Sequence, residues 1–228
     1  MAKYVVAIDG VAGSGKSTTA RGVARRLNFF YLDTGAMYRA VTLKYLQLTE
    51  KTDTIDMEII KKIIDNTKID LRQENSNTCV YLDEKDVTQE IRSPAVNDFV
   101  SQISAIPEVR EWMVDRQREV AEGKNVVCEG RDIGTVVFPD AQVKIYMQAD
   151  LDARAKRRLN ELAEKKIVVH LDEVIENLKF RDRYDSQRRH SPLKKADDAI
   201  VVDTTHLTIE EEIELVEKIV KARFEKIT

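Results

Sequence analysis

The sequence predicts an α/β fold in which a doubly wound, mostly parallel sheet of five strands carries a phosphate-binding loop. Three observations lead to this prediction. Five short apolar runs alternate with stretches of helical periodicity, a glycine-rich loop follows the first run, and two segments interrupt the alternation. We therefore expect the 228 residues to form a single domain with a core of residues 1–65, 107–150 and 193–228. The interrupting segments are residues 66–106 and 151–192.

The five apolar runs predict buried parallel strands, because they are short, continuous and rich in β-branched residues. They cover residues 4–8, 29–32, 126–128, 143–147 and 199–202.

Three helices are predicted from their spacing and their end signals. After the glycine-rich loop, Ala20, Val23, Ala24 and Leu27 fall on one helical face. A second helix covers residues 107–122, since a proline suits its first turn and a glycine follows its end.

The third helix is predicted near the end of the chain. Thr208 and Glu211 have the spacing of a capping box, which marks a helix start. The apolar side of this helix is predicted to carry Ile209, Ile213, Val216 and Val220.

The two interrupting segments differ in character. Residues 66–106 contain strand-like runs at 68–71 and 79–82, with polar turns at 74–77 and 83–86. This pattern predicts a small inserted antiparallel β subdomain. Residues 151–192 are polar, helical and dense in arginine, which predicts a short helical lid.

Composition excludes several classes of protein. Lys+Arg number 37 and Asp+Glu 40, so a net charge of -3 gives no general attraction to nucleic acid or anionic membranes. Cys79 and Cys128 are far apart and the three histidines are scattered, which argues against a disulfide scaffold or a zinc site. With no signal-peptide pattern and no membrane-length apolar run, we expect a soluble, cytoplasmic protein.

The glycine-rich loop matches the P-loop pattern G-x-x-x-x-G-K-S and lies between a predicted strand and a predicted helix. Its backbone N–H groups and the helix N-terminus attract phosphate oxygens. Lys16 can reach the β- and γ-phosphates, and the Ser17 hydroxyl can bind Mg²⁺. The predicted ATP-binding residues are Gly10, Val11, Ala12, Gly13, Ser14, Gly15, Lys16, Ser17 and Thr18.

The rest of the chain favours a small kinase over other P-loop proteins. A GTP switch needs Asn-Lys-x-Asp, and the nearest match, residues 67–70, lacks the asparagine. No glycine has an aspartate three residues before it, as a γ-phosphate sensor requires. A nucleotide-hydrolysing switch or binding module therefore remains the weaker alternative.

A kinase needs a second anion site, and three places could supply it. Residues 33–39 and 129–134 each follow a predicted strand, at the strand end where ligands bind in such sheets. Arg181, Asp185 and Arg188 share one face of a helix. The alternatives are a solvated surface charge for Arg39 and an i,i+4 ion pair for Arg181 with Asp185.

The lid segment carries three more arginines on one predicted helix face, Arg154, Arg157 and Arg158. They either form a solvated basic face or bring cations to the transferring phosphoryl group.

Residues 10–18, 32–39 and 129–140 together resemble bacterial-type cytidylate kinases, the nucleoside-monophosphate kinases that transfer the γ-phosphoryl group of ATP to CMP or dCMP. The similarity runs from about residue 4 to about residue 205, because residues 181–199 match as well. The resemblance implies a P-loop kinase core with a monophosphate-binding insertion and a lid. It also implies a role in pyrimidine nucleotide metabolism and a monomeric state.

The resemblance assigns roles to individual residues. Thr34, where the family often has serine, would read the cytosine together with Arg110 and Asp132. The α-phosphate would be held by Arg39, Arg131 and Arg188, and the sugar by Arg181 and Asp185. The catalytic set would be Lys16, Arg131, Arg154, Arg157, Arg158 and Arg188.

The chemistry needs no general base, because a phosphate monoester with a second pKa of about 6 is already ionised at neutral pH. A kinase for a hydroxyl acceptor would need a base, and Asp33 or Asp132 could serve. That alternative stays open on chemical grounds.

Overall fold

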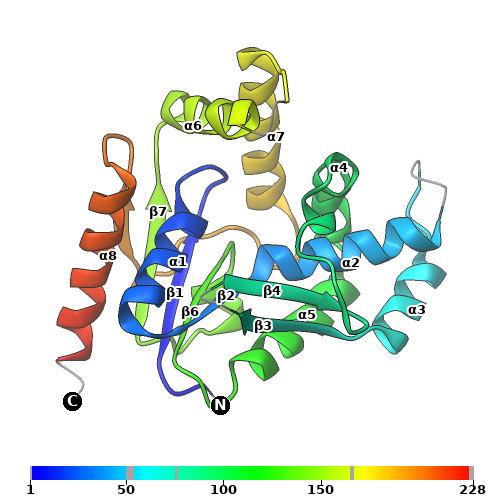
Figure 1. Ribbon diagram of the computed structural model, residues 1–228, viewed down its shortest axis with the longest axis horizontal. Helices are drawn as coiled ribbons and strands as arrows, with labels where there is room; N and C mark the ends of the chain where they lie inside the picture. Colours follow the sequence, from blue (N-terminus) through cyan, green and yellow to red (C-terminus); the bar gives the residue numbers. More distant parts are fainter. Residues whose placement is uncertain (1, 50–53, 75–76, 165–166, 226–228) are drawn as a thin grey trace. The chain divides into compact units, whose positions relative to one another are not determined.

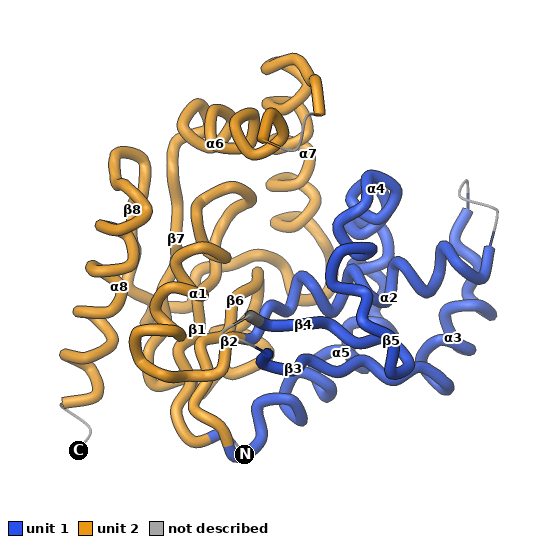
Figure 2. Tube along the Cα trace, in the orientation of Figure 1, with its two compact units in different colours: residues 1–2, 32–123 blue, residues 3–31, 124–228 orange. Residues whose placement is uncertain are grey.

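The computed structural model describes residues 2–49, 54–74, 77–164 and 167–225. The chain forms two compact units, which Figure 2 colours separately. The first, here called the sheet unit, comprises residues 3–31 and 124–228. The second, here called the helical unit, comprises residues 2 and 32–123. These boundaries differ from those of the predicted core, insertion and lid, and that functional division stays a prediction.

The five predicted strands form one sheet in the order β2-β6-β1-β7-β8. Strand β1 pairs in parallel with both β6 and β7, and β7 pairs in parallel with β8. The parallel α/β fold predicted from the sequence is thus confirmed. The strands are β1 (Val5–Gly10), β2 (Phe30–Asp33), β6 (Val126–Gly130), β7 (Val143–Gln148) and β8 (Ile200–Asp203).

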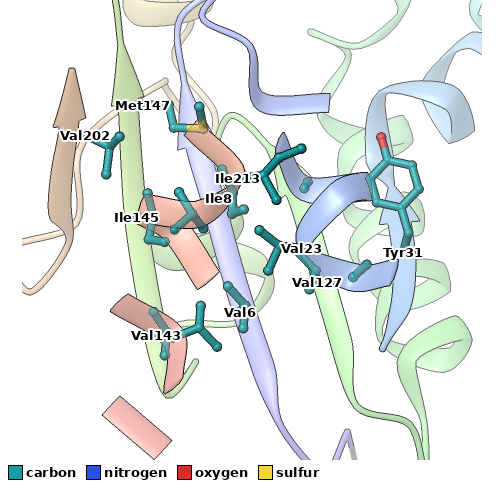
Figure 3. Close-up of a cluster of buried hydrophobic side chains, with 14 residues drawn as sticks. Val6, Ile8, Val23, Tyr31, Val127, Val143, Ile145, Met147, Val202 and Ile213 are labelled. Atoms are coloured by element: carbon teal, nitrogen blue, oxygen red, sulfur yellow. The ribbon is translucent and has the colours of Figure 1, made fainter. Parts of the chain in front are cut away.

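Helices α1 (Lys16–Leu27) and α8 (Ile209–Phe224) lie side by side against this sheet (Figure 1). Their apolar faces meet the strands in one buried cluster, in which Val23, Val127 and Ile213 lie close together (Figure 3). The predicted apolar side of α8 was wrong at one position. Ile209 is 59% exposed, because it is the first residue after the Thr208 cap and lies beyond the packed face.

Helices α6 (Leu151–Glu164) and α7 (Leu171–Gln187) pack against each other in the sheet unit (Figure 1). A second apolar cluster joins Ala155 of α6 with Val174 and Leu178 of α7. Ala12 of the phosphate loop belongs to the same cluster. The base of the predicted lid is therefore packed directly on the phosphate loop.

The helical unit contains the predicted antiparallel sheet, formed by β3 (Ile69–Glu74), β4 (Asn77–Leu82) and β5 (Lys85–Asp86). Its first predicted turn includes residues 75 and 76, which lie outside the described residues. The second predicted turn, over 83–86, was too long. Asp83 and Glu84 alone make it, both with positive φ, as a two-residue hairpin turn requires.

Four helices and one short 3₁₀ turn complete the described part of the helical unit. They are α2 (Thr34–Leu48), α3 (Met57–Asn66), the turn at Glu90–Arg92, α4 (Pro94–Ile103) and α5 (Pro107–Ala121). Across the described ranges of the chain, no helix combines the length and hydropathy needed to cross a membrane.

Candidate active site

The phosphate loop connects β1 to α1 at the carboxyl edge of the sheet, because all the paired strands in the sheet unit run in the same direction. Gly15 at its end has a φ of 89°, in the left-handed region. A Cβ there would lie 2.4 Å from a carboxylate oxygen of Glu212. Glycine is therefore required at this position by both backbone conformation and space.

Lys16 is buried, and its ammonium donates to the Val11 carbonyl oxygen at 2.6 Å. Burial and, to a smaller extent, the nearby charge of Arg131 lower the pKa of Lys16 to about 7, while Glu129 opposes the change. A bound polyphosphate would favour the charged form. The loop thus holds a lysine whose charge depends on what binds next to it.

An arginine–aspartate cluster, defined as Arg131, Asp132, Asp185 and Arg188, lies in the sheet unit. The Arg131 Nε atom donates to Asp185 Oδ2 at 2.7 Å. Arg188 Nη2 lies 3.6 Å from Asp132 Oδ1, and Arg188 Nη1 lies 3.9 Å from Asp185 Oδ1. Four predicted site residues from two distant segments are thus brought together.

Several guanidinium groups act on the buried Asp185 carboxylate of this cluster. Burial raises the pKa of Asp185, but the charges of Arg131, Arg188 and Arg181 and the hydrogen bond from Arg131 leave it below its ordinary value. Glu129 and Asp182 in turn act on Arg131. The guanidinium groups gathered here have fork-shaped donors that suit phosphate oxygens.

The three lid arginines, predicted to share one role, reach different partners. Arg154 is buried and donates to the Ala12 carbonyl oxygen at 3.0 Å and to Asp182 Oδ2 at 2.7 Å. Arg158 pairs with Glu161 on its own helix at 2.9 Å. Arg154 therefore contacts the phosphate loop itself, whereas Arg158 lies partly exposed.

The third arginine, Arg157, belongs to what we call the glutamate cluster, defined as Thr19, Arg157, Thr204 and Glu212. The buried Glu212 carboxylate accepts from Thr19 Oγ1 at 2.8 Å and lies 3.1 Å from Arg157 Nη2. Thr204 Oγ1 accepts from Arg157 at 3.1 Å and donates to the Ser14 carbonyl oxygen at 3.0 Å. This cluster ties the phosphate loop and α1 to the β8–α8 connection.

Three acidic residues at or next to the phosphate loop were not predicted from the sequence. Asp182 accepts from the Ala12 backbone N–H at 3.3 Å, Glu212 lies beside Gly15, and Asp9, just before the loop, accepts from the turn after β6. Asp9 and Asp182 lie next to motif residues in the sequence, which was a usable signal. Nothing in the sequence distinguishes Glu212 from its neighbouring glutamates.

Three predicted residues lie in the helical unit. Thr34 is buried in the first turn of α2, which is capped by the Asp33 carboxylate. Arg39 donates to Asn97 Oδ1 at 2.6 Å. The buried Arg110 donates to the Ser104 carbonyl oxygen at 3.0 Å, and its guanidinium lies 5.3 Å from the Tyr38 ring centre. The Arg39 and Arg110 side chains thus bond to residues of their own unit.

A magnesium ion would have to be held mainly by substrate oxygens. Among the described residues, no group of three or more His, Cys, Asp or Glu side chains could hold a metal. The Ser17 hydroxyl is exposed in the first turn of α1. Mg²⁺ commonly takes one or two protein oxygens together with phosphates and water, so this side chain fits.

The chain is similar in sequence to cytidylate kinases over nearly its whole length. The family model "Cytidylate kinase" matches residues 6–222. A cytidylate kinase from Fusobacterium nucleatum is 48% identical over 218 residues, covering 96% of this chain and 97% of that protein. A cytidylate kinase from Caldanaerobacter subterraneus is 51% identical over 211 residues, covering 92% of each.

Solved structures resemble the chain in fold. A putative kinase from Chloroflexus aurantiacus superimposes with a TM-score of 0.50 at 11% identity, covering 97% of both chains. An uncharacterized protein from Eubacterium ventriosum gives 0.51 at 12% identity, covering 96% of this chain and 98% of that one. At such identities the likeness concerns the fold alone. The full-length family match and the close relatives together show that this chain belongs to the cytidylate kinase family.

Proposed function

We propose that this protein transfers the γ-phosphoryl group of ATP to CMP and dCMP, forming CDP and dCDP. The observation that carries the proposal is the arginine–aspartate cluster, which gathers the guanidinium groups of Arg131 and Arg188 in the same unit as the phosphate loop. Cytidylate kinases use ATP as donor and a small nucleotide as acceptor, and the chain matches this family over nearly its whole length.

The donor site comprises residues 10–18. Lys16 would pair with the β- and γ-phosphates, and loop N–H groups would donate to their oxygens. Mg²⁺, held by Ser17 and the phosphates, would neutralise charge on the transferred group. Arg154 supports this arrangement, because it binds the loop carbonyl of Ala12 and lies close to the phosphates' expected position.

The acceptor site is proposed from residue types and local geometry. Arg39, Arg131 and Arg188 would hold the α-phosphate, and Arg181 and Asp185 the sugar. Arg131 is held for this role by two contacts, because its Nε donates to Asp185 and its Nη1 donates to the Gly130 carbonyl oxygen.

The cytosine would be read by Thr34, Arg110 and Asp132. A carboxylate such as Asp132 accepts a hydrogen bond from the exocyclic amino group of cytosine. Uracil carries a carbonyl acceptor at that position, so its oxygen would face the carboxylate oxygen without a hydrogen bond between them. Selectivity for CMP over UMP would follow from this difference.

The reaction would proceed without a general base, because the attacking oxygen belongs to an ionised phosphate. The residues contribute by positioning two polyanions in line and by stabilising charge on the equatorial oxygens. Lys16, Arg131 and Arg188 are the proposed cations for this task.

The two segments that interrupt the predicted core are proposed to bind the acceptor and to close the site. Residues 66–106 would form the monophosphate-binding insertion, and residues 151–192 the lid that excludes water. Arg158 retains solvent exposure and could move with the lid, whereas Arg157 would brace its base. We also propose a cytoplasmic monomer that binds neither nucleic acid nor membranes, in keeping with its near-neutral charge.

The test is a coupled ADP-release assay with ATP and a panel of CMP, dCMP, UMP, AMP and shikimate. Release that depends on CMP or dCMP supports the proposal. Release without any acceptor would favour a nucleotide hydrolase, and release only with shikimate would favour a hydroxyl acceptor.

A further inference from the structure

Asp9 lies at the junction between the sheet and the phosphate loop. It pairs across β1 with Gly130 of β6 on one side and with Tyr146 of β7 on the other. The next residue, Gly10, has a φ of 150°, and a Cβ there would lie 2.0 Å from the Met147 carbonyl oxygen. The backbone at Asp9 and Gly10 is therefore packed closely between β6 and β7.

The Asp9 carboxylate is buried and uses both oxygens on the turn that follows β6. Oδ1 accepts from the Ile133 N–H and Oδ2 accepts from the Gly134 N–H, each at 2.8 Å. These two amides open the short helical turn Ile133–Val137, so their N–H groups have no acceptor within it. Asp9 supplies that acceptor from a strand more than 100 residues away in sequence.

Such amides are usually capped by the residue just before the helix, and aspartate is a favoured cap. Here that residue is Asp132, and its side chain makes no capping bond. Its Oδ1 atom instead lies 3.6 Å from Arg188 Nη2, in the arginine–aspartate cluster. Asp9 thus performs the local task that Asp132 would otherwise perform.

We propose that Asp9 is a positioning residue for selectivity of cytosine over uracil: by capping the turn after β6 it keeps the Asp132 carboxylate directed at the base of the acceptor nucleotide. The inference rests on the proposed function, since it assumes that Asp132 reads the cytosine. It goes beyond that function because it states that Asp9, in the strand that precedes the phosphate loop, sets the orientation of Asp132.

Asp9→Asn tests the inference with little change in volume. The amide keeps one acceptor and turns an NH₂ group toward the other backbone N–H, so one cap bond is lost and Asp132 is drawn into capping. We expect the ratio of kcat/KM for CMP over UMP to fall about tenfold, with KM for ATP changed by less than about twofold. Equal losses for CMP, UMP and ATP would overturn the inference.

Glu212→Gln is the matched control. Glu212 is also a buried carboxylate beside the phosphate loop, but it contacts Thr19 and Arg157 and not the turn after β6. The CMP-over-UMP ratio should stay unchanged in this variant. A similar fall in both variants would mean that any disturbance of the loop alters selectivity, and would also overturn the inference.

A double-mutant cycle separates this inference from the proposed function. If Asp9 acts through Asp132, the variant Asp9→Asn/Asp132→Ala should match Asp132→Ala in selectivity, whereas independent effects would add. Additivity overturns the role of Asp9 and leaves the base-reading role of Asp132 intact. Full selectivity in Asp132→Ala alone overturns the base-reading role, and the selectivity role of Asp9 with it.

The cap itself is testable in the wild-type protein, where folding is not in question. Burial raises the pKa of Asp9 to about 6, although the two backbone hydrogen bonds act to lower it. The charged or titratable groups that face Asp9 are Asp132, Lys16 and Tyr146. The amide NMR shifts of Ile133 and Gly134 should titrate together with a midpoint near this value. In Asp9→Asn, neither amide shift should titrate near this pH. Amides that do not titrate, or that still titrate in the variant, would overturn the cap.

Discussion

Two ionic clusters of the sheet unit are built from similar side chains but differ in how many guanidinium groups they gather. The arginine–aspartate cluster contains two arginines and two carboxylates, with Arg181, Glu129 and Asp182 within electrostatic reach. The glutamate cluster pairs one arginine with one carboxylate, and its remaining donors reach Thr204 and the loop carbonyl of Ser14. The first places several guanidinium groups around the buried Asp185, whereas the second has a single guanidinium group whose partners are all protein atoms.

This difference indicates that ionic character alone does not mark a ligand site. A balanced cluster whose donors all reach protein acceptors holds secondary-structure elements together. A cluster that gathers several guanidinium groups at one place offers fork-shaped donors to an external anion.

Arg131→Met should reduce CMP-dependent turnover by at least about 100-fold, the scale seen when one donor to transition-state charge is removed. The melting temperature should fall as well, because Asp185 loses its partner at 2.7 Å and keeps only Arg188 at 3.9 Å, so turnover is compared at a temperature where the variant is folded. Steady-state kinetics and thermal unfolding measure the two quantities. Wild-type turnover would remove the arginine–aspartate cluster from the proposed active site.

Arg154→Met should lower kcat about tenfold, since this side chain holds the Ala12 carbonyl of the phosphate loop through a buried contact. Arg158→Met is the matched control on the same helix, and its kcat should stay within about threefold because it pairs only with Glu161 at a partly exposed site. Comparable losses in both variants would restore the prediction that these arginines share one role.

Glu212→Gln should lower the free energy of unfolding by roughly 2 kcal/mol, somewhat less than for a fully buried pair because Arg157 keeps part of its solvent contact. Urea denaturation measures this value. Turnover with saturating substrates should remain within about threefold of wild type at a temperature where the variant is folded. A large loss of turnover with unchanged stability would place the glutamate cluster in the active site.

ATP binding at pH 8 should take up close to one proton. With its pKa lowered to about 7 by burial, Lys16 is mostly neutral at that pH, and bound phosphates should raise its pKa and charge it. Calorimetry in buffers of different ionisation enthalpy measures the uptake. Lys16→Arg should abolish it, since arginine stays protonated; uptake that persists in this variant comes from another group.

Local signals predicted most of the fold. The five strands, the capping box at Thr208 and the end of the helix before Gly123 depend on short-range periodicity and on end residues, and the structure confirms them. The misplaced Ile209 and the shortened turn at Asp83–Glu84 were boundary errors, which short-range patterns resolve poorly.

The sequence by itself determined the phosphate loop, its place between strand and helix, and the motifs of the cytidylate kinase family. The partners of the charged side chains were decided only by the tertiary structure. Arg154, Arg157 and Arg158 look equivalent on a helical wheel, yet they contact the phosphate loop, the β8–α8 connection and their own helix. Asp9 and Ile133 are 124 residues apart, and Thr19 and Glu212 are 193 apart. Periodicity specifies which face of an element is buried, but only the folded chain brings such distant groups within hydrogen-bond distance.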